Sequence, residues 1–304
     1  MRSVMRTVTA AVFSFCQLSA GSADGTAASQ LDVAIAARAI QPGEVVRIDI
    51  SCRCSMPLEQ VKAEVFGRQI AFGRSGQSWR GLVGIDLAVR PGPHIVTIDA
   101  AGTGLPALAA TETLRVIPKS FPTRRLRVAP EFVEPSPAAL ERIARENKRI
   151  EAVIQAVSAG LWDGIALQPV DAIAIGNFGS RSFFNGQPRA PHGGIDFSAG
   201  TGTPVKAPSA GRIVLVDDLF FTGNTIIIDH GQGLYSLLAH LSQAGVKVGT
   251  DVTPGEIVGL VGATGRVTGP HLHWSVRLNG ARVDPLSLAA VGRDGGSQLS
   301  RTVP

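Results

Sequence analysis

The sequence predicts a mainly β protein in which two β-rich parts are joined by a proline-rich linker and one helix. Its 304 residues are enough for about two domains, each with its own core. Short apolar or alternating runs separated by turn residues recur on both sides of the linker. Only the stretch between them has a clear helical period.

The first part, residues 31–117, is expected to form a small antiparallel β-sandwich of immunoglobulin-like type. Alternating or apolar runs mark its candidate strands at residues 45–50, 61–66 and 94–99. Glycines and prolines punctuate them at residues 42–43, 73–76 and 91–93. No chemistry is visible in this part, so a binding module, a spacer and a partial cover over the cleft of the second part all stay open.

Residues 118–160 are expected to form a linker and an amphipathic helix. The linker, residues 118–135, is rich in proline and basic, and its Arg124, Arg125 and Arg127 are expected to be solvated. Ser136 followed by Pro137 is typical of a helix start. An apolar face of Leu140, Ile143, Ile150, Ile154 and Val157 should pack on a domain surface, and Gly160 is placed to end the helix.

The N-terminus predicts export. Two arginines precede a mostly apolar run at residues 7–20 and small residues at 20–23, the pattern of a signal peptide spanning residues 1–23. The run is too short to cross a bilayer, so we expect no stable membrane insertion after cleavage; a retained anchor is the alternative. Removing Arg2 and Arg6 lowers the net charge from +5 to +3, which gives no ground for nucleic-acid binding.

The second part, residues 167–290, carries the chemistry. His271 and His273 lie one residue apart in a short predicted strand, so both imidazoles project from one face. His192 and Asp196 add an imidazole and a carboxylate. Two imidazoles and a carboxylate are ligands of the kind that Zn²⁺ takes when it keeps a fourth position for water. This donor set therefore predicts a catalytic zinc site with one ion per chain.

Each of these motifs alone would be weak, because histidine has many structural roles. Here both motifs follow a proline and are crowded by glycines, and a third element supplies His240 in the same stretch. The remaining candidates receive structural interpretations. His230 is expected to stabilise a turn, His94 to be an ordinary residue at the start of a strand, and Asp284 to anchor a turn.

Five segments in order carry a resemblance to a known family: Pro-His192-x-Gly-x-Asp196, Gly202-Thr-Pro-Val-x-Ala207, the run from Gly223 to Gly233, Ala-His240-Leu-Ser, and Gly265-x-x-Thr-Gly-Pro-His271-Leu-His273. From about residue 178 to residue 286 the chain resembles the M23 zinc metallopeptidases of the lysostaphin and LytM type. The resemblance implies a LytM-like antiparallel β-sheet domain with His192, Asp196 and His273 as zinc ligands. It also implies that His240 and His271 flank the metal-bound water as catalytic histidines. Leu238 stands where the family often has Tyr.

The residues agree with hydrolysis by a metal-activated water. The chain has no His-Glu-x-x-His helix, no Gly-x-Ser-x-Gly elbow and no Gly-Lys pair to end a Walker A loop. We expect an exported zinc endopeptidase, periplasmic or secreted, and the resemblance implies peptidoglycan peptide stems or cross-bridges as its substrate. An adaptor protein stays open as a partner. The alternatives are a non-catalytic M23-like activator of a cell-wall amidase and a metal carrier.

Overall fold

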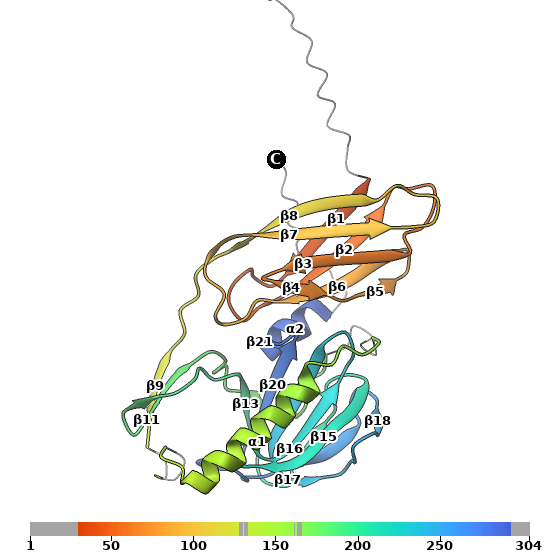
Figure 1. The fold of residues 1–304 in the computed structure, drawn as a ribbon. Coiled ribbons are helices and arrows are strands. Elements are labelled where there is room, and N and C mark those ends of the chain that lie inside the picture. The colour runs from red at the N-terminus through yellow and green to blue at the C-terminus, as the bar shows by residue number, and fades with distance from the viewer. Residues whose placement is uncertain (1–29, 128–129, 131–132, 161, 163–165, 293–304) are drawn as a thin grey trace, which may run out of the picture.

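The computed structural model describes residues 30–127, 130, 133–160, 162 and 166–292, and it is mainly β as the sequence predicts. Figure 1 shows an N-terminal lobe of strands, a second lobe of strands with α1 (Pro137–Ile154) lying across it, and α2 (Pro285–Gly292) between the lobes. No helix in the described ranges is both long enough and apolar enough to cross a membrane. The signal peptide expected at residues 1–23 lies outside the described residues.

The N-terminal lobe is a β-sandwich. Its two antiparallel sheets have the strand orders β1-β2-β6-β5 and β4-β3-β7-β8, and buried residues of both sheets form one apolar cluster. In β7 every second side chain is buried, as expected for a strand with one face on a core. Cys52 and Cys54, whose redox state the sequence leaves open, form a disulfide at the end of β2. The strands are β1 (Leu31–Ala37), β2 (Val45–Cys52), β3 (Gln60–Val65), β4 (Arg68–Ile70), β5 (Phe72–Ser75), β6 (Ser78–Gly84), β7 (Gly92–Ala101) and β8 (Leu108–Val116).

The second lobe is built on a larger sheet with the central order β10-β13-β20-β17-β16-β15-β18. Strand β14 pairs with β19, β19 also pairs with β17, and β21 pairs with β20. Phe197, Ile226 and Trp274 lie fully buried in the core under this sheet. The strands are β10 (Ile173–Ala174), β13 (Gly194–Ser198), β14 (Pro204–Lys206), β15 (Gly211–Leu219), β16 (Gly223–Asp229), β17 (Leu234–Ala244), β18 (Asp251–Val252), β19 (Ile257–Val261), β20 (Leu272–Leu278) and β21 (Ala281–Val283).

Part of the expected linker is a strand. β9 (Thr123–Leu126) pairs in parallel with β11 (Arg181–Phe184), which pairs with β12 (Gln187–Pro188) to complete a three-stranded sheet. Asn185 and Gly186 between β11 and β12 both have positive φ, which is the backbone that a tight Asn-Gly hairpin requires. The segment that joins the lobes is therefore also built into the second lobe.

The expected helix is α1 (Pro137–Ile154), but it ends earlier than predicted. Ser136 caps its start by accepting the Ala139 N–H, and Gln155 closes its end, so Gly160 does not terminate it. The hydroxyl of Tyr235 donates to the carbonyl of Ala156 and holds the chain after the last turn against the sheet.

Only part of the predicted apolar face of α1 is used. Ile150, Val153 and Ile154 pack against a small cluster on the second lobe. Leu140 and Val157, expected on the same face, are exposed. The apolar contact is thus confined to the C-terminal half of the helix.

A short helix, α2 (Pro285–Gly292), follows Asp284, where the sequence predicts only a turn. Asp284 does anchor this turn, because its carboxylate accepts the Leu286 N–H and its carbonyl accepts the Ser287 N–H. Leu288 and Val291 are buried in the core of the second lobe. Being apolar around most of its surface, the helix lacks the periodic pattern by which it could be recognised.

The two lobes share a packed seam. Val45 and Leu82 of the sandwich belong to the apolar core of the second lobe. Arg38 bridges Glu44 and Asp284, and Asp86 accepts two hydrogen bonds from the Arg282 side chain and one from its backbone N–H. These contacts lie at α2, β21 and the far end of β20. None of these seam contacts involves His192, Asp196 or His273.

Candidate metal centre and active site

Two facing strands place Asp196 opposite His273. β13 and β20 are antiparallel and pair these two residues directly, so their side chains lie on the same face of the sheet. Nδ1 of His273 is 2.9 Å from Oδ1 of Asp196. A Cβ at Gly194 would lie 2.8 Å from the imidazole of His273 and 2.4 Å from the carbonyl of Trp274. Only glycine leaves room for this ring.

His192 reaches the same carboxylate from the segment before β13. Its backbone N–H donates to Ser180 and its carbonyl accepts from Gly179, which fixes the segment beside the residues leading into β11. Nε2 of His192 is 3.3 Å from Oδ1 of Asp196. One donor atom from each of His192, Asp196 and His273 lies within 4.8 Å of the others. The structure therefore brings together the three residues that the sequence predicts as zinc ligands.

Asn177 orients the carboxylate, and sequence analysis missed it. Its side-chain amide donates to Oδ2 of Asp196 at 2.5 Å, while its amide oxygen accepts the Asp196 backbone N–H. Asn177 is buried. Because Oδ2 is engaged, Oδ1 is the oxygen that faces the histidines. A buried partner that holds a candidate ligand in this way commonly tunes a metal site.

The electrostatics favour an ionised Asp196 beside a neutral His273 imidazole. Burial alone would raise the pKa of Asp196, but hydrogen bonds with His192 and His273 outweigh it and hold this pKa well below its usual range. Burial lowers the pKa of His273 despite its hydrogen bond to Asp196. A carboxylate and neutral imidazoles are the protonation states in which these side chains bind a cation.

The donor set fits a zinc ion. Imidazole nitrogen and carboxylate oxygen are among the ligands of catalytic zinc sites, and three protein ligands leave one position open.

His240 lies on β17 beside this cluster, with its backbone in the left-handed region at φ 63°. Its N–H donates to the carbonyl of Thr222, and its Nδ1 is 2.9 Å from the carbonyl of Thr264. Since a carbonyl only accepts, Nδ1 carries the proton and Nε2 keeps its lone pair. Burial, together with the neighbouring His273, lowers the pKa of His240 to about 3, so the ring is neutral near pH 7.

His271 has the same tautomer. Its Nδ1 is 2.9 Å from the carbonyl of Gly269, which leaves Nε2 as the acceptor, 3.9 Å from Oδ1 of Asp196. The rings of His240 and His271 have their centroids 4.7 Å apart. The two histidines predicted to be catalytic therefore lie together, and each has a ring nitrogen available as a base.

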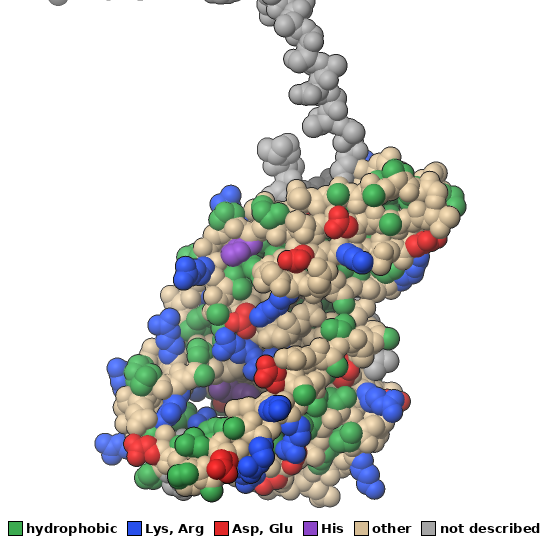
Figure 2. Space-filling view, in the orientation of Figure 1, with side chains coloured by type: hydrophobic (Ala, Val, Ile, Leu, Met, Phe, Trp, Pro, Cys, Tyr) green, Lys and Arg blue, Asp and Glu red, His purple; other side chains and the backbone are tan. Residues whose placement is uncertain are grey.

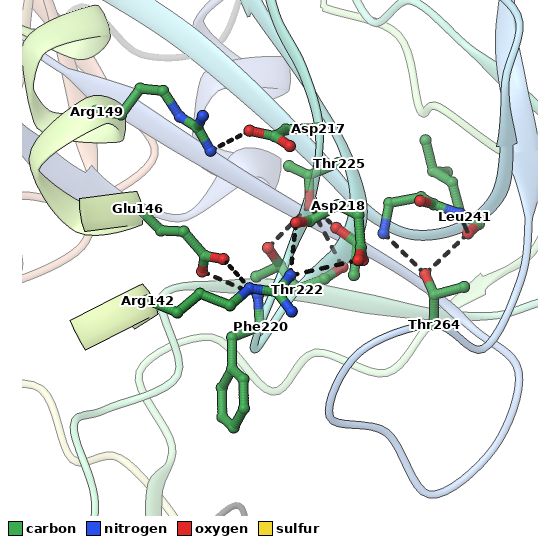
Figure 3. A network of polar contacts seen from close by, with 12 residues as sticks. Arg142, Glu146, Arg149, Asp217, Asp218, Phe220, Thr222, Thr225, Leu241 and Thr264 are labelled. Atoms are coloured by element: carbon green, nitrogen blue, oxygen red, sulfur yellow. Dashed lines mark hydrogen bonds and ion pairs between the residues drawn. The ribbon is translucent and has the colours of Figure 1, made fainter. Parts of the chain in front are cut away.

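A polar network connects α1 to the turn that contains Phe220 and Thr222 (Figure 3). Glu146, buried on α1, binds Arg142 and accepts the backbone N–H of Phe220. Two residues later, the carbonyl of Thr222 accepts the His240 N–H. On the other side of the turn, the hydroxyl of Thr264 donates to the carbonyl of Leu241 and accepts the backbone N–H of Asn224.

Close packing keeps this turn against Thr264. A Cβ at Gly223 would lie 2.3 Å from the Thr264 hydroxyl, so only glycine permits this approach. The backbone around His240 is thus held from both sides, by α1 through Phe220 and by the segment that carries Thr264.

The site is open to solvent. Figure 2 shows histidine side chains in a hollow of the second lobe, with Lys and Arg side chains around it. The side chains of His192, His271 and Asp196 are 23%, 20% and 18% exposed. These side chains are therefore partly accessible to solvent.

The other predicted positions are structural. His230 is buried and bonded to the carbonyl of Ala210 and the hydroxyl of Ser236, and its backbone N–H pairs with Leu234 across the predicted turn. His94 is bonded to the carbonyl of Arg90 and packs edge-on against Phe66. Neither belongs to the metal cluster.

Comparison with known proteins agrees with this geometry. Residues 190–285 match the sequence profile of Peptidase family M23. A solved structure from Pseudomonas aeruginosa, described as a candidate M23 peptidase, has 36% sequence identity and a TM-score of 0.65; the alignment covers 83% of this chain and 96% of that one. The chain belongs to peptidase family M23.

Relatives of this M23 chain include cell-wall enzymes. It is 46% identical over 98 residues to the DD-carboxypeptidase/endopeptidase Mpg of Neisseria meningitidis. It is 41% identical over 97 residues to the peptidoglycan DD-endopeptidase ShyA of Vibrio cholerae. Each alignment covers 32% of this chain and only 23% of the relative, so the chain matches less than a quarter of the length of these proteins.

Proposed function

We propose that this M23 chain is a zinc-dependent endopeptidase that hydrolyses peptide cross-links of peptidoglycan. The observation that carries the proposal is the cluster of His192, Asp196 and His273, whose donor atoms lie within 4.8 Å of one another, beside two further histidines. The names of the relatives, a DD-carboxypeptidase/endopeptidase and a peptidoglycan DD-endopeptidase, support this substrate class.

His192, Asp196 and His273 would hold the ion. When bound there, Zn²⁺ supplies a Lewis acid that polarises a carbonyl and lowers the pKa of water to about 7. Asn177 keeps one oxygen of Asp196 engaged and the other directed at the histidines. The chain thus fixes the direction of its carboxylate ligand before any metal binds.

His240 and His271 handle the proton. In each ring Nδ1 donates to a backbone carbonyl, so Nε2 is the atom that accepts a proton from the attacking water and later returns it to the leaving amine. Once protonated, the same Nε2–H can donate to the oxygen on which negative charge develops. The fixed tautomers make both rings ready as bases without rearrangement.

The alternative of a non-catalytic activator is not favoured by this site. An M23-like protein that only activates an amidase does not need metal ligands. This chain retains the full donor set with a buried orienting amide, together with both additional histidines.

Export follows from the substrate. Peptidoglycan lies outside the cytoplasmic membrane, and the N-terminal pattern at residues 1–23 predicts a signal peptide. We propose that the protein acts in the periplasm, with secretion as the alternative and an adaptor protein as an untested partner.

Digestion of purified wall fragments tests the proposal. The zinc-loaded protein should convert cross-linked fragments into monomers in a mass spectrum while leaving uncross-linked fragments intact. Asp196→Ala should lose both the metal, measured by elemental analysis, and the activity. Full zinc occupancy in Asp196→Ala would show that the ligand set is misassigned. Persistence of cross-links in the presence of folded, zinc-loaded wild-type protein would refute the endopeptidase.

A further inference from the structure

Arg266, five residues before His271, has no acidic partner for its guanidinium among the described residues. The guanidinium of Arg266 lies over the rings of Phe184 and Phe221, with its central carbon 4.8 Å and 4.4 Å from the two ring centroids. Its backbone N–H donates to Phe221. None of the hydrogen bonds or ion pairs within the described ranges engages its side-chain N–H groups.

Arg266 has a basic neighbour. Burial, together with the charge of Arg189, lowers the pKa of Arg266. One terminal nitrogen of Arg189 donates to the carbonyl of Val133 and to the side-chain amide oxygen of Gln187. The Nε of Arg189 is buried and has no hydrogen-bond partner in the part of the chain that is described. Glu134 is close to this group but accepts from Gln187. Two partly desolvated guanidiniums thus lie near one another, and each has N–H groups left to donate.

Both arginines flank segments that carry site residues. Arg189 is three residues before His192, and Arg266 is five residues before His271. Phe221 immediately precedes Thr222, the residue that binds the backbone of His240. Phe184, whose ring also contacts Arg266, is the last residue of β11. The two rings that contact Arg266 therefore come from two different segments, each next in sequence to residues that contact the site.

The chemistry of this arrangement selects an anion. A guanidinium that lies over aromatic rings contacts them through its faces, so its N–H edge remains able to match the two oxygens of a carboxylate. Partial burial strengthens such a contact by reducing competition with water. The stems of peptidoglycan are peptides with free carboxylates, so a substrate of the proposed function supplies this group.

We infer that Arg266, assisted by Arg189, forms a subsite that binds a free carboxylate of the substrate peptide beside the metal centre. This inference rests on the proposed function for its substrate class. It makes Arg266 a specificity-determining residue that distinguishes free stems from stems whose carboxylates are amidated.

The test is calorimetric binding of an uncross-linked stem pentapeptide and of the same peptide with every carboxylate amidated. Wild-type protein should bind the free peptide at least about tenfold more tightly, as expected for a charge-assisted hydrogen bond. In Arg266→Met the difference should disappear, because Met keeps an apolar contact with both rings but has no donor. Arg266→Lys should keep part of the difference in affinity between the two peptides. The control Arg115→Met, at an exposed position on β8, should keep all of this difference.

Equal binding of the two peptides by the wild type, or discrimination retained in a folded Arg266→Met protein, would overturn the inference. So would a failure to bind the free peptide. The outcome separates from that of the proposed function because binding is measured without turnover. Discrimination that depends on Arg266 supports the subsite even if no cross-link is cut.

Discussion

Glu146 on α1 accepts a hydrogen bond from the backbone N–H of Phe220, which lies 74 residues further along the chain. Phe220 begins the turn whose Thr222 carbonyl holds the His240 N–H. A side chain outside the region that matches the family profile therefore supports the backbone of a predicted catalytic histidine. It acts through this turn and contacts no reacting atom, so it is a positioning residue.

Glu146→Ala should lower kcat by about tenfold to a hundredfold, because small displacements of a catalytic group are costly. KM and zinc content should stay near the wild-type values. Glu146→Gln should recover part of the rate, since an amide oxygen still accepts the Phe220 N–H. Glu141→Gln, at an exposed site on the same helix, is the matched control. Loss of zinc or of the folded state in parallel with kcat would show a general structural role instead.

Asn177→Ala should weaken zinc binding by about tenfold to a hundredfold, the usual effect of removing a side chain that orients a metal ligand. In the wild-type structure, the side-chain amide of Asn177 donates to the carboxylate of Asp196 and accepts its backbone N–H. Competition with a chromophoric chelator would measure the affinity. Gln243→Ala, at an exposed position of β17, should leave it unchanged. Equal affinity in folded Asn177→Ala would remove Asn177 from the metal site.

His240→Ala and His271→Ala should each retain zinc and lose turnover by about 10²–10⁴-fold, the range of general acid–base contributions. Their rings face the cluster but are not among its three grouped donors. Elemental analysis and a cleavage assay on the same samples would separate the two properties. A wild-type rate in either variant would contradict its proposed catalytic role.

Asp86→Asn should weaken the seam between the lobes. Burial raises the pKa of Asp86, but the hydrogen bonds from Arg282 and Ala88 outweigh it and hold this pKa at about 2. A carboxyl with a depressed folded-state pKa stabilises the fold above its unfolded pKa of about 4, and this stabilisation is lost as the pH falls toward 2.

Removing the charge should therefore lower the free energy of unfolding at pH 7 by about 1–2 kcal/mol and flatten its dependence between about pH 4 and pH 2. Urea titrations at several pH values would measure this. Asp99→Asn, exposed on β7, should follow the wild type. An unaltered pH dependence in Asp86→Asn would mean that the seam does not depend on this carboxylate.

Local patterns predicted much of this structure. Alternating burial in β7 and the His-x-His spacing of His271 and His273 depend on strand geometry alone, so a sequence shows them directly. Donor chemistry suggested that His192 and Asp196 join this site, but the exact ligand set of His192, Asp196 and His273 was implied by the family resemblance, because it depends on how β13 and β20 pair.

Features that depend on contacts between residues far apart in the sequence could not be predicted from the sequence. Asn177 orients a carboxylate 19 residues away and belongs to no recognised pattern. β9 is a short polar run between prolines, and only its pairing with β11 makes it a strand. The end of α1 is likewise fixed by tertiary contact, because Tyr235 holds the chain beyond Ile154 against the sheet.

The parallel pairing of β9 with β11 has a practical consequence for protein engineering. A cassette cut at the start of the family match, residue 190, would leave behind both strands, Asn177 and the helix that carries Glu146. Such a cassette would transfer the three predicted ligand positions without the surrounding residues that orient them. In chimeric lytic enzymes, the natural junction for this unit therefore lies upstream of β9, between the sandwich and residue 121.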